Sequence, residues 1–511
     1  MPQRRPDILI VMADQLTPGA LATYGQPLTH APNIGALADD GVVFDAAYTA
    51  SPLCSPARAS FMSGLLPSRT GTYDNAAEFR SDIPTFAHHL RRAGYRTVLS
   101  GKMHFCGPDQ LHGFEERLTT DIYPADYGWT PDWDHPERRL SWYHDMSSVV
   151  EAGPCLRTNQ LDFDDEVAFC AERALYDHVR TEDDRPFCFV VSFSHPHDPF
   201  AIPRRFYDLY RDEDIPMPGV TLTTDEMHPH ERRLHELCAM GALTVTEEHV
   251  RRARRAYYGA VSYVDEHVGR LTALLRDTGR LENTVVMVTS DHGEMLGERG
   301  FWYKMSFYEG SARVPLIVRA PTLFSAGRVA SPVSTMDLLP TLVDLAYDGD
   351  AAPRPGPLDG RSLLPQLTGR TGPDDVAAEY LAEGAIAPIV MLRRGTLKFI
   401  HCPADPDQLF DLATDPQERH NLLDSPSHQP VLTSFRAEVA LRWDLPSLDR
   451  SVRDSQQRRQ AIVAALAHGA RAPWDYQPRV DASTRYIRNH MDLLDLEAMA
   501  RFPRVGVVSS E

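Results

Sequence analysis

The feature of this sequence that most restricts its fold is a series of short, continuous apolar runs. Four runs are almost wholly apolar: 8–12, 187–193, 284–289 and 315–318. A run without alternating polar positions is typical of a strand buried on both faces of a parallel sheet. Segments with helical periodicity lie between the runs, at 33–40, 85–93, 164–180 and 247–278. The alternation predicts an α/β fold in which helices sandwich a large, mainly parallel sheet.

Reactive side chains follow three of the predicted strands. In chain order they are Asp14, His195, His197, Asp291 and His292. Because the carboxyl ends of parallel strands meet at one edge of a sheet, we expect these side chains to lie close together. Carboxylates that share a site repel one another unless a cation lies between them, so two aspartates beside a histidine indicate a metal site.

The overall charge excludes several classes of partner. The chain of 511 residues has 52 basic and 71 acidic side chains, a formal net charge of −19. Such a balance argues against a protein held on nucleic acid or on an anionic membrane by its overall field. The seven cysteines show no Cys-x-x-Cys spacing, which argues against a disulfide framework or a structural zinc site. No apolar run approaches the roughly 18 residues of a membrane span. We therefore expect a reduced, cytoplasmic protein.

The character of the sequence changes after about residue 370. Short strand-like pieces at 389–393 and 397–401 are followed by helical patterns. We predict a catalytic domain over 1–370, a smaller α+β subdomain over 371–460 and a tail over 461–511 that serves oligomerisation and closure of the site. A long irregular segment at 119–160 contains three tryptophans, and such a loop in a compact domain is commonly functional.

One short segment indicates a nucleophile. In Cys54-Ser55-Pro56-Ala-Arg58, the serine is a good N-cap and the proline a good first residue of a helix that stops near Gly64. Cys54 would then face the amide groups of a helix N-terminus, which suits an anion, and Arg58 could reach the same place. The alternative is a buried structural cysteine beside a solvent-facing arginine. A cysteine phosphatase is excluded, because it needs arginine at position 60, where this chain has serine.

The spacing Cys-x-Pro-x-Arg resembles the signature of the sulfatase family. The segments 67–71 (PSRTG), 94–97 (GYRT) and 101–104 (GKMH) also match that family. The resemblance implies an alkaline-phosphatase-like fold, with Cys54 oxidised by a maturation enzyme to formylglycine. It also implies one divalent metal; its ligands would be Asp14, Cys54, Asp291 and His292. Gln15 and His292 replace an aspartate and an asparagine of many sulfatases, which leaves Ca²⁺ and Mn²⁺ as alternatives.

The same resemblance implies the catalytic side chains. They would be Cys54, Arg58, Lys102, His104, His197 and Lys304. The hydrated aldehyde would attack sulfur, His197 with Lys304 would protonate the departing alcohol, and His104 would help the second hydroxyl expel sulfate. His195 is the alternative acid.

Within the family, the chain most resembles the branch that contains the choline sulfatases and the phosphonate monoester hydrolases. The implied substrate is choline-O-sulfate, whose quaternary ammonium suits aromatic faces and nearby carboxylates. The implied binding residues are Asn75, Trp129, His144, Glu383 and Asp492, in a homodimer or homotetramer. The alternatives are an arylsulfatase or a phosphonate or phosphodiester hydrolase on the same scaffold, and a non-catalytic protein that binds a sulfated osmolyte.

Overall fold

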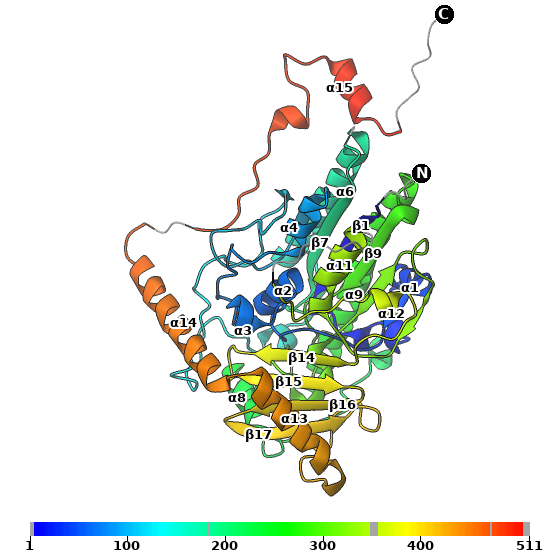
Figure 1. The fold of residues 1–511 in the computed structure, drawn as a ribbon. Coiled ribbons are helices and arrows are strands. Elements are labelled where there is room, and N and C mark those ends of the chain that lie inside the picture. Colours follow the sequence, from blue (N-terminus) through cyan, green and yellow to red (C-terminus); the bar gives the residue numbers. More distant parts are fainter. Residues whose placement is uncertain (1–4, 182, 348–355, 471–472, 504–511) are drawn as a thin grey trace, which may run out of the picture.

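The computed structural model describes residues 5–181, 183–347, 356–470 and 473–503. An eight-stranded sheet runs through the centre of the molecule (Figure 1). Its strands, in spatial order, are β12 (Gly327–Val329), β2 (Val42–Phe44), β11 (Leu316–Arg319), β9 (Thr284–Thr289), β1 (Asp7–Asp14), β7 (Phe187–Pro196), β4 (Arg96–Gly101) and β5 (Glu116–Arg117). The predicted α/β fold is confirmed.

The three longest apolar runs form the centre of this sheet. β1 lies between β7 and β9 and is parallel to both, and all three strands are buried along their whole length. The fourth run forms β11, which is antiparallel to β9. The chain between β9 and β11 contains no helix long enough to cross the sheet, only the four-residue α10 (Glu309–Ala312), so the returning strand reverses direction.

Helices cover both faces of the sheet. Leu9 and Val11 of β1 pack into one apolar cluster with α1 (Pro32–Asp39), α6 (Asn159–Arg180) and α9 (Glu247–Asp277). The alternate residues Ile8 and Ile10 pack into a second cluster with α2 (Cys54–Ser63), α4 (Phe86–Arg92) and α11 (Leu338–Ala346). This alternation is what a strand buried between two helical layers requires.

The predicted helices are present, and the largest boundary error is at the start of α6. α6 begins at Asn159, five residues before the predicted start at 164, because the Thr158 side chain accepts a hydrogen bond from the Leu161 amide at 3.1 Å and caps the helix. The remaining short elements are β3 (Ala47–Tyr48), α3 (Pro67–Thr70), α5 (Ser147–Val150), β6 (Gly153–Cys155), β8 (Ala201–Pro203), α7 (Arg204–Tyr207), α8 (Pro229–Leu237), β10 (Arg313–Val314), β13 (Val333–Ser334) and α12 (Leu364–Leu367).

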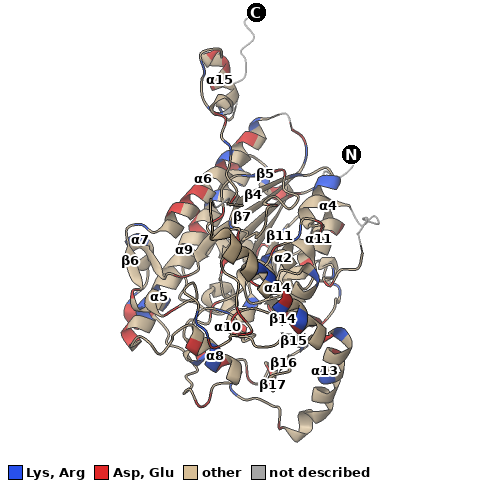
Figure 2. Ribbon diagram, turned by 90° about the vertical axis from the view of Figure 1, so that its left-hand side faces the viewer, with Lys and Arg blue, Asp and Glu red and all other residues tan. Residues whose placement is uncertain are grey.

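A second, antiparallel sheet follows in the C-terminal part. It consists of β14 (Asp375–Tyr380), β15 (Ile389–Arg394), β16 (Leu397–Cys402) and β17 (Asp405–Asp411). α13 (Gln429–Arg442) packs on β16, α14 (Leu445–Leu466) follows, and α15 (Leu493–Ala500) is the last helix that the structure describes. In Figures 1 and 2, α15 stands at the edge of the molecule, beyond the end of α6. The division into domains at 370 and 460 stays a prediction.

Three properties of the described residues can be compared with the sequence. Acidic residues outnumber basic ones along the outer helix α6, in line with the negative net charge (Figure 2). Of the helices that the structure describes, none combines the length and the hydropathy needed to cross a membrane. All seven cysteines are free.

Candidate active site

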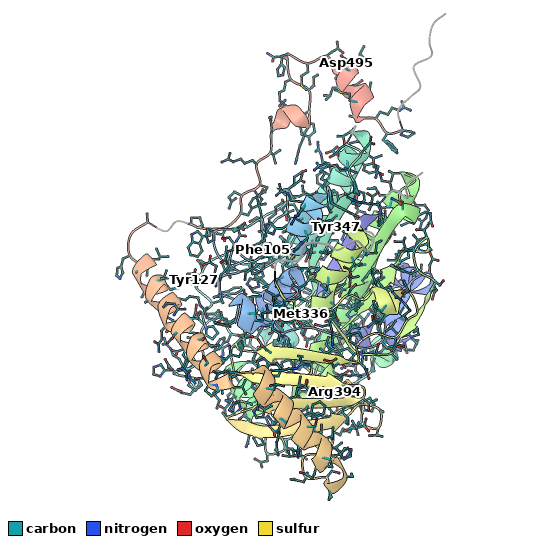
Figure 3. The ribbon with its side chains drawn as sticks, viewed as in Figure 1. Phe105, Tyr127, Met336, Tyr347, Arg394 and Asp495 are labelled. Atoms are coloured by element: carbon teal, nitrogen blue, oxygen red, sulfur yellow. The ribbon has the colours of Figure 1, made fainter. Side chains whose placement is uncertain are left out.

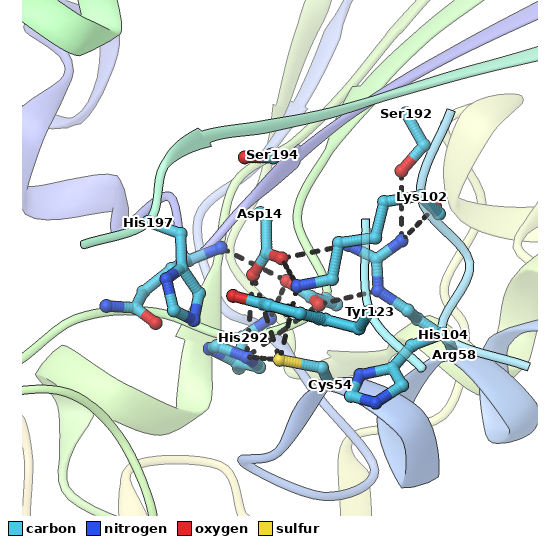
Figure 4. A network of polar contacts seen from close by, with 12 residues as sticks. Asp14, Cys54, Arg58, Lys102, His104, Tyr123, Ser192, Ser194, His197 and His292 are labelled. Carbon is cyan, nitrogen blue, oxygen red and sulfur yellow. Dashed lines mark hydrogen bonds and ion pairs between the residues drawn. The ribbon is translucent and has the colours of Figure 1, made fainter. Parts of the chain in front are cut away.

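The candidate site lies where the central strands of the large sheet end. Asp14 is the last residue of β1, Lys102 follows β4, His197 follows β7, and Asp291 and His292 follow β9. Figure 4 shows the side chains of Asp14, Lys102, His197 and His292 around Cys54, which belongs to helix α2. The structure therefore brings together the side chains that the strand-end argument grouped, with the exception of His195.

Cys54 occupies the start of a helix, although the local prediction was wrong in detail. α2 begins at Cys54 itself, two residues before the predicted first residue Pro56. Ser55 does not cap the helix with its side chain; its backbone N–H donates to the Asn75 side-chain oxygen at 3.0 Å. The cap is thus supplied by a residue twenty positions away, which local helix signals do not contain. The predicted stop is correct, because Gly64 has φ +68° and ends the helix.

Four side chains form a cluster with the composition of a metal site. The potential ligand atoms of Asp14, Cys54, Asp291 and His292 lie within 4.8 Å of one another, and all four residues are buried. The Cys54 sulfur lies 3.1 Å from His292 Nε2 and 3.9 Å from Asp14 Oδ1. Two carboxylates and an imidazole are suitable donors for a divalent cation. Burial lowers the pKa of His292, which keeps the imidazole neutral and able to donate its lone pair.

Two buried cations stabilise the carboxylates of this cluster. Arg58 Nε lies 2.8 Å from Asp291 Oδ2, and its NH2 lies 3.5 Å from Asp14 Oδ2. Lys102 forms an ion pair with Asp14, and its Nζ lies 3.6 Å from the Cys54 sulfur. Although burial opposes their ionisation, the nearby positive charges hold the pKa of both aspartates below the usual value.

Two buried lysines activate the thiol at position 54. Burial and the Asp14 carboxylate oppose ionisation of Cys54, but Lys102, Lys304 and a contact from His104 outweigh them and lower its pKa to about 6. The sulfur marks where a nucleophilic oxygen would lie if the residue were oxidised. An anionic nucleophile is therefore favoured at this position.

His197 and Lys304 lie together on one side of Cys54. Lys304 Nζ is 2.7 Å from His197 Nε2 and 2.6 Å from the side-chain oxygen of Gln15. His197 Nδ1 lies 2.7 Å from the Asp198 carbonyl oxygen, which can only accept, so Nδ1 carries the proton and Nε2 faces the lysine. His195 instead pairs through Nδ1 with Asp164 of α6 at 2.7 Å. The structure thus directs His197, and not His195, into the site.

His104 lies on the other side of Cys54 in Figure 4. It is 1% exposed and has φ +53°, an uncommon backbone conformation. Asp121 holds this turn, because one carboxylate oxygen accepts the backbone N–H groups of Met103 and His104, both at 2.9 Å. Sequence analysis did not select Asp121, and its position in an irregular loop gave no signal.

A cavity of about 250 Å³ opens from this cluster. Cys54, His197 and Lys304 are among the residues that line it. The lining also includes an aromatic wall, consisting of Tyr123, Trp129, Trp142, Tyr143 and His144. The Trp129 and Trp142 rings are stacked at 6.2 Å, and Tyr123 meets Trp129 edge-on at 5.1 Å. Of the residues in this wall, only Trp129 and His144 were predicted to bind substrate. The sequence signal for the other three was the tryptophan-rich loop in which they lie.

The two predicted carboxylates have different positions. Glu383 lines the cavity, is 5% exposed, and burial raises its pKa to about 7. Asn75 also lines the cavity. Asp492 is exposed and caps α15, where it accepts hydrogen bonds from the Leu494 and Asp495 amides. Within one chain it does not line the cavity, so its role in binding stays a prediction.

The fold and the site define a hydrolase that acts on an ester of a small tetrahedral anion. The family model "Sulfatase" matches residues 6–348, "N-sulphoglucosamine sulphohydrolase, C-terminal" matches 297–442, and "Choline sulfatase enzyme C terminal" matches 450–502. The chain belongs to the sulfatase family, whose members hydrolyse sulfate esters.

Individual relatives agree with this assignment. A choline-sulfatase of Rhizobium meliloti is 52% identical over 98% of this chain and 99% of its own length. An arylsulfatase of Clostridium perfringens is 28% identical over 84% of this chain and 93% of its own length. The solved phosphonate monoester hydrolase of Agrobacterium radiobacter superposes with a TM-score of 0.69 at 24% identity, covering 88% of this chain and 96% of that one, which shows a shared fold.

The cluster predicts that one divalent metal binds through His292. The His292→Ala variant should bind Mn²⁺ or Ca²⁺ about tenfold or more weakly, because a direct ligand is lost. Metal content after equilibrium dialysis, measured by mass spectrometry, provides the readout. His195→Ala is a matched control, since this buried histidine lies outside the cluster. Equal metal retention by both variants would contradict the assignment.

Proposed function

We propose that this sulfatase hydrolyses choline-O-sulfate to choline and sulfate, with a formylglycine made from Cys54 as nucleophile. The observation that carries the proposal is one cavity with two unlike sets of lining residues, which we assign to the two ends of the substrate. One set is the cations around Cys54, and the other is the stacked tryptophans together with the buried carboxylate of Glu383. The 52% identity to a choline-sulfatase over nearly the full length supports the same substrate.

The cationic end suits the sulfate group. Lys102 and Lys304 are fully buried, and neighbouring anions raise the pKa of both against the effect of burial, so both are charged. Such fixed charges stabilise the negative charge that develops on sulfate oxygens. A metal held by Asp14, residue 54, Asp291 and His292 would polarise the ester and acidify the attacking hydroxyl. We propose Ca²⁺ or Mn²⁺, and the imidazole ligand favours Mn²⁺.

The leaving alcohol needs a proton, because an alkoxide is a poor leaving group at neutral pH. A hydroxyl of residue 54 first loses its proton to solvent, which the neighbouring buried cations favour, and the oxyanion then attacks sulfur while the bond from sulfur to the choline oxygen breaks. Lys304 supplies a proton to that oxygen, and His197, whose Nε2 faces Lys304, assists the transfer. Gln15 accepts a hydrogen bond from Lys304 and holds it in place.

Release of sulfate needs a base on the other side. His104 is placed to take the proton of the second hydroxyl of residue 54. The carbon–oxygen bond to sulfate then breaks, the aldehyde forms again, and sulfate leaves with the bonding electron pair. An ordinary alcohol at this position has no second hydroxyl and could not complete this step.

The other end of the cavity suits a quaternary ammonium. Such a cation cannot donate a hydrogen bond from nitrogen and is stabilised by aromatic faces, which Trp129 and Trp142 provide. Glu383 supplies a negative charge, while Asn75 and His144 complete the lining. The cavity volume of about 250 Å³ is appropriate for a small substrate.

The proposal includes partners and location. The apolar residues Leu493, Leu494 and Met499 of α15 are 51%, 73% and 54% exposed, which supports a homodimer or homotetramer in which Asp492 of one chain reaches the cavity of another. A maturation enzyme would form the aldehyde. Seven free cysteines support a reducing, cytoplasmic location.

The aromatic wall makes a prediction about charge. In Trp129→Ala, kcat/KM for choline sulfate should fall roughly tenfold or more, because a desolvated cation–π contact is lost. The loss should be much smaller for 3,3-dimethylbutyl sulfate, in which carbon replaces the charged nitrogen. Trp129→Phe, which keeps an aromatic face, is the control. Equal losses for the two esters, measured by sulfate release, would contradict a cation site.

The raised pKa of Glu383 makes a prediction about pH. The carboxyl must be ionised to attract the ammonium group, and it gains a proton as the pH falls through about 7. KM for choline sulfate should therefore rise between about pH 8 and about pH 6.

The ester 3,3-dimethylbutyl sulfate, which has no ammonium group, should not show this rise in KM. Glu383→Gln should give a high KM that no longer depends on pH in this range. Identical pH profiles of KM for wild type and variant would show that Glu383 does not bind the cation.

A further inference from the structure

The loop that carries Trp129 is braced by a helix from the far end of the chain. α14 lies beside this loop, in which Figure 3 labels Tyr127. Arg453 NH1 donates to the Trp133 carbonyl oxygen at 2.9 Å, and the side-chain oxygen of Gln456 accepts the Trp133 N–H at 2.9 Å. Gln460 donates to the Pro131 carbonyl oxygen at 3.1 Å. Pro131 and Trp133 of the loop are therefore both hydrogen-bonded to one helix.

Arg459 forms a buried ion pair with Asp74. Its NH1 and NH2 each donate to one oxygen of the Asp74 carboxylate at 2.7 Å, and the residue is only 5% exposed. NH1 also donates to the Thr130 hydroxyl oxygen at 3.0 Å. A buried, bidentate arginine–carboxylate pair fixes direction as well as distance. Arg459 thus ties together two segments that are more than fifty residues apart in sequence.

In each of the two segments that Arg459 holds, the residue adjacent to its hydrogen-bond partner lines the cavity. Thr130 directly follows Trp129, and Asp74 directly precedes Asn75. The Thr130 hydroxyl donates to the Tyr127 carbonyl oxygen at 2.7 Å. A continuous hydrogen-bond chain therefore runs from Arg459 through Thr130 to Tyr127 and closes the turn on which Trp129 sits.

A second brace supports the same turn from the segment after α14. The Asp475 carboxylate accepts the Ala125 N–H at 3.1 Å, and the Trp474 ring meets the Tyr127 ring edge-on at 5.1 Å. These residues, and those of α14 that contact the loop, fall within 450–502, the part matched by the model "Choline sulfatase enzyme C terminal". The contacts lie within a single chain and do not need a second copy.

We propose that Arg459 is a positioning residue that sets the alcohol side of the cavity. It holds the Trp129 turn and the Asp74–Asn75 segment in the arrangement that receives the substrate's alcohol group. The proposal rests on the proposed function, since it assigns the aromatic wall to the choline end of the substrate. It adds that the C-terminal segment contributes to substrate specificity through contacts within its own chain.

The variant Arg459→Lys tests this role, because lysine keeps the charge but cannot form the bidentate pair and the Thr130 contact together. We expect kcat/KM for choline sulfate to fall about fivefold or more, mainly through KM. Methyl sulfate has no alcohol chain to reach the aromatic wall, so its hydrolysis should change by less than about twofold. Arg458→Lys, an exposed neighbour on the same helix, is the control and should leave both substrates unchanged.

Tryptophan fluorescence gives a readout that does not depend on turnover. The loop contains three of the six tryptophans, so its displacement in Arg459→Lys should shift the emission maximum, whereas Arg458→Lys should not. If Arg459→Lys does not fold, the same measurements are made on Gln456→Leu. This variant removes the hydrogen bond from the Trp133 N–H and keeps the buried ion pair of Arg459 with Asp74.

The outcomes separate the two proposals. Equal losses for choline sulfate and methyl sulfate would show a general structural role and overturn the positioning role. Unchanged kinetics and emission in a folded variant would overturn it as well. A wild-type enzyme that shows no preference for choline sulfate over methyl sulfate would instead contradict the proposed function, and the emission shift would then decide whether Arg459 positions the loop.

Discussion

The structure depends on the compensation of charge at the carboxyl edge of the large sheet. Asp14 and Asp291 are buried there with Arg58 and Lys102, and none of these side chains contacts solvent. Isolated charges at such a position would cost several kcal/mol each, so the ion pairs are a condition for folding this edge. The strands β1 and β9 and the helix α2 must therefore keep their mutual positions. The same arrangement places Cys54 against a concentration of positive charge, which is what an anionic nucleophile requires.

The cavity extends this electrostatic pattern into a bipolar site. Around Cys54 the buried cations suit an anion, while at the aromatic end the rings and Glu383 suit a cation. The net charge of −19 is thus compatible with a sulfate ester, because the anion is held by a small buried cluster and not by the surface field. Both ends of a zwitterionic substrate can be recognised in one enclosed space, and this explains how a family fold can serve a particular alcohol.

Sequence patterns predicted the features that depend on local order. The apolar runs located the central strands, and the run at 284–289 matches β9 at both ends. The strand-end argument grouped Asp14, Asp291 and His292, because parallel strands bring their ends together. The features that could not be predicted depend on contacts between residues that are far apart in sequence. Arg459 and Asp74 are 385 residues apart, and no periodicity relates them.

The strongest test of this account concerns the residue at position 54. If a hydroxyl there attacks sulfur, the Cys54→Ser variant has a nucleophile but no second hydroxyl to release the product. After incubation with choline sulfate, mass spectrometry of the tryptic peptide that contains position 54 should show the addition of one SO₃ group, with release of one choline per chain and no further turnover. An unmodified peptide, under conditions in which the wild-type enzyme releases sulfate, would contradict the assignment of residue 54 as the nucleophile.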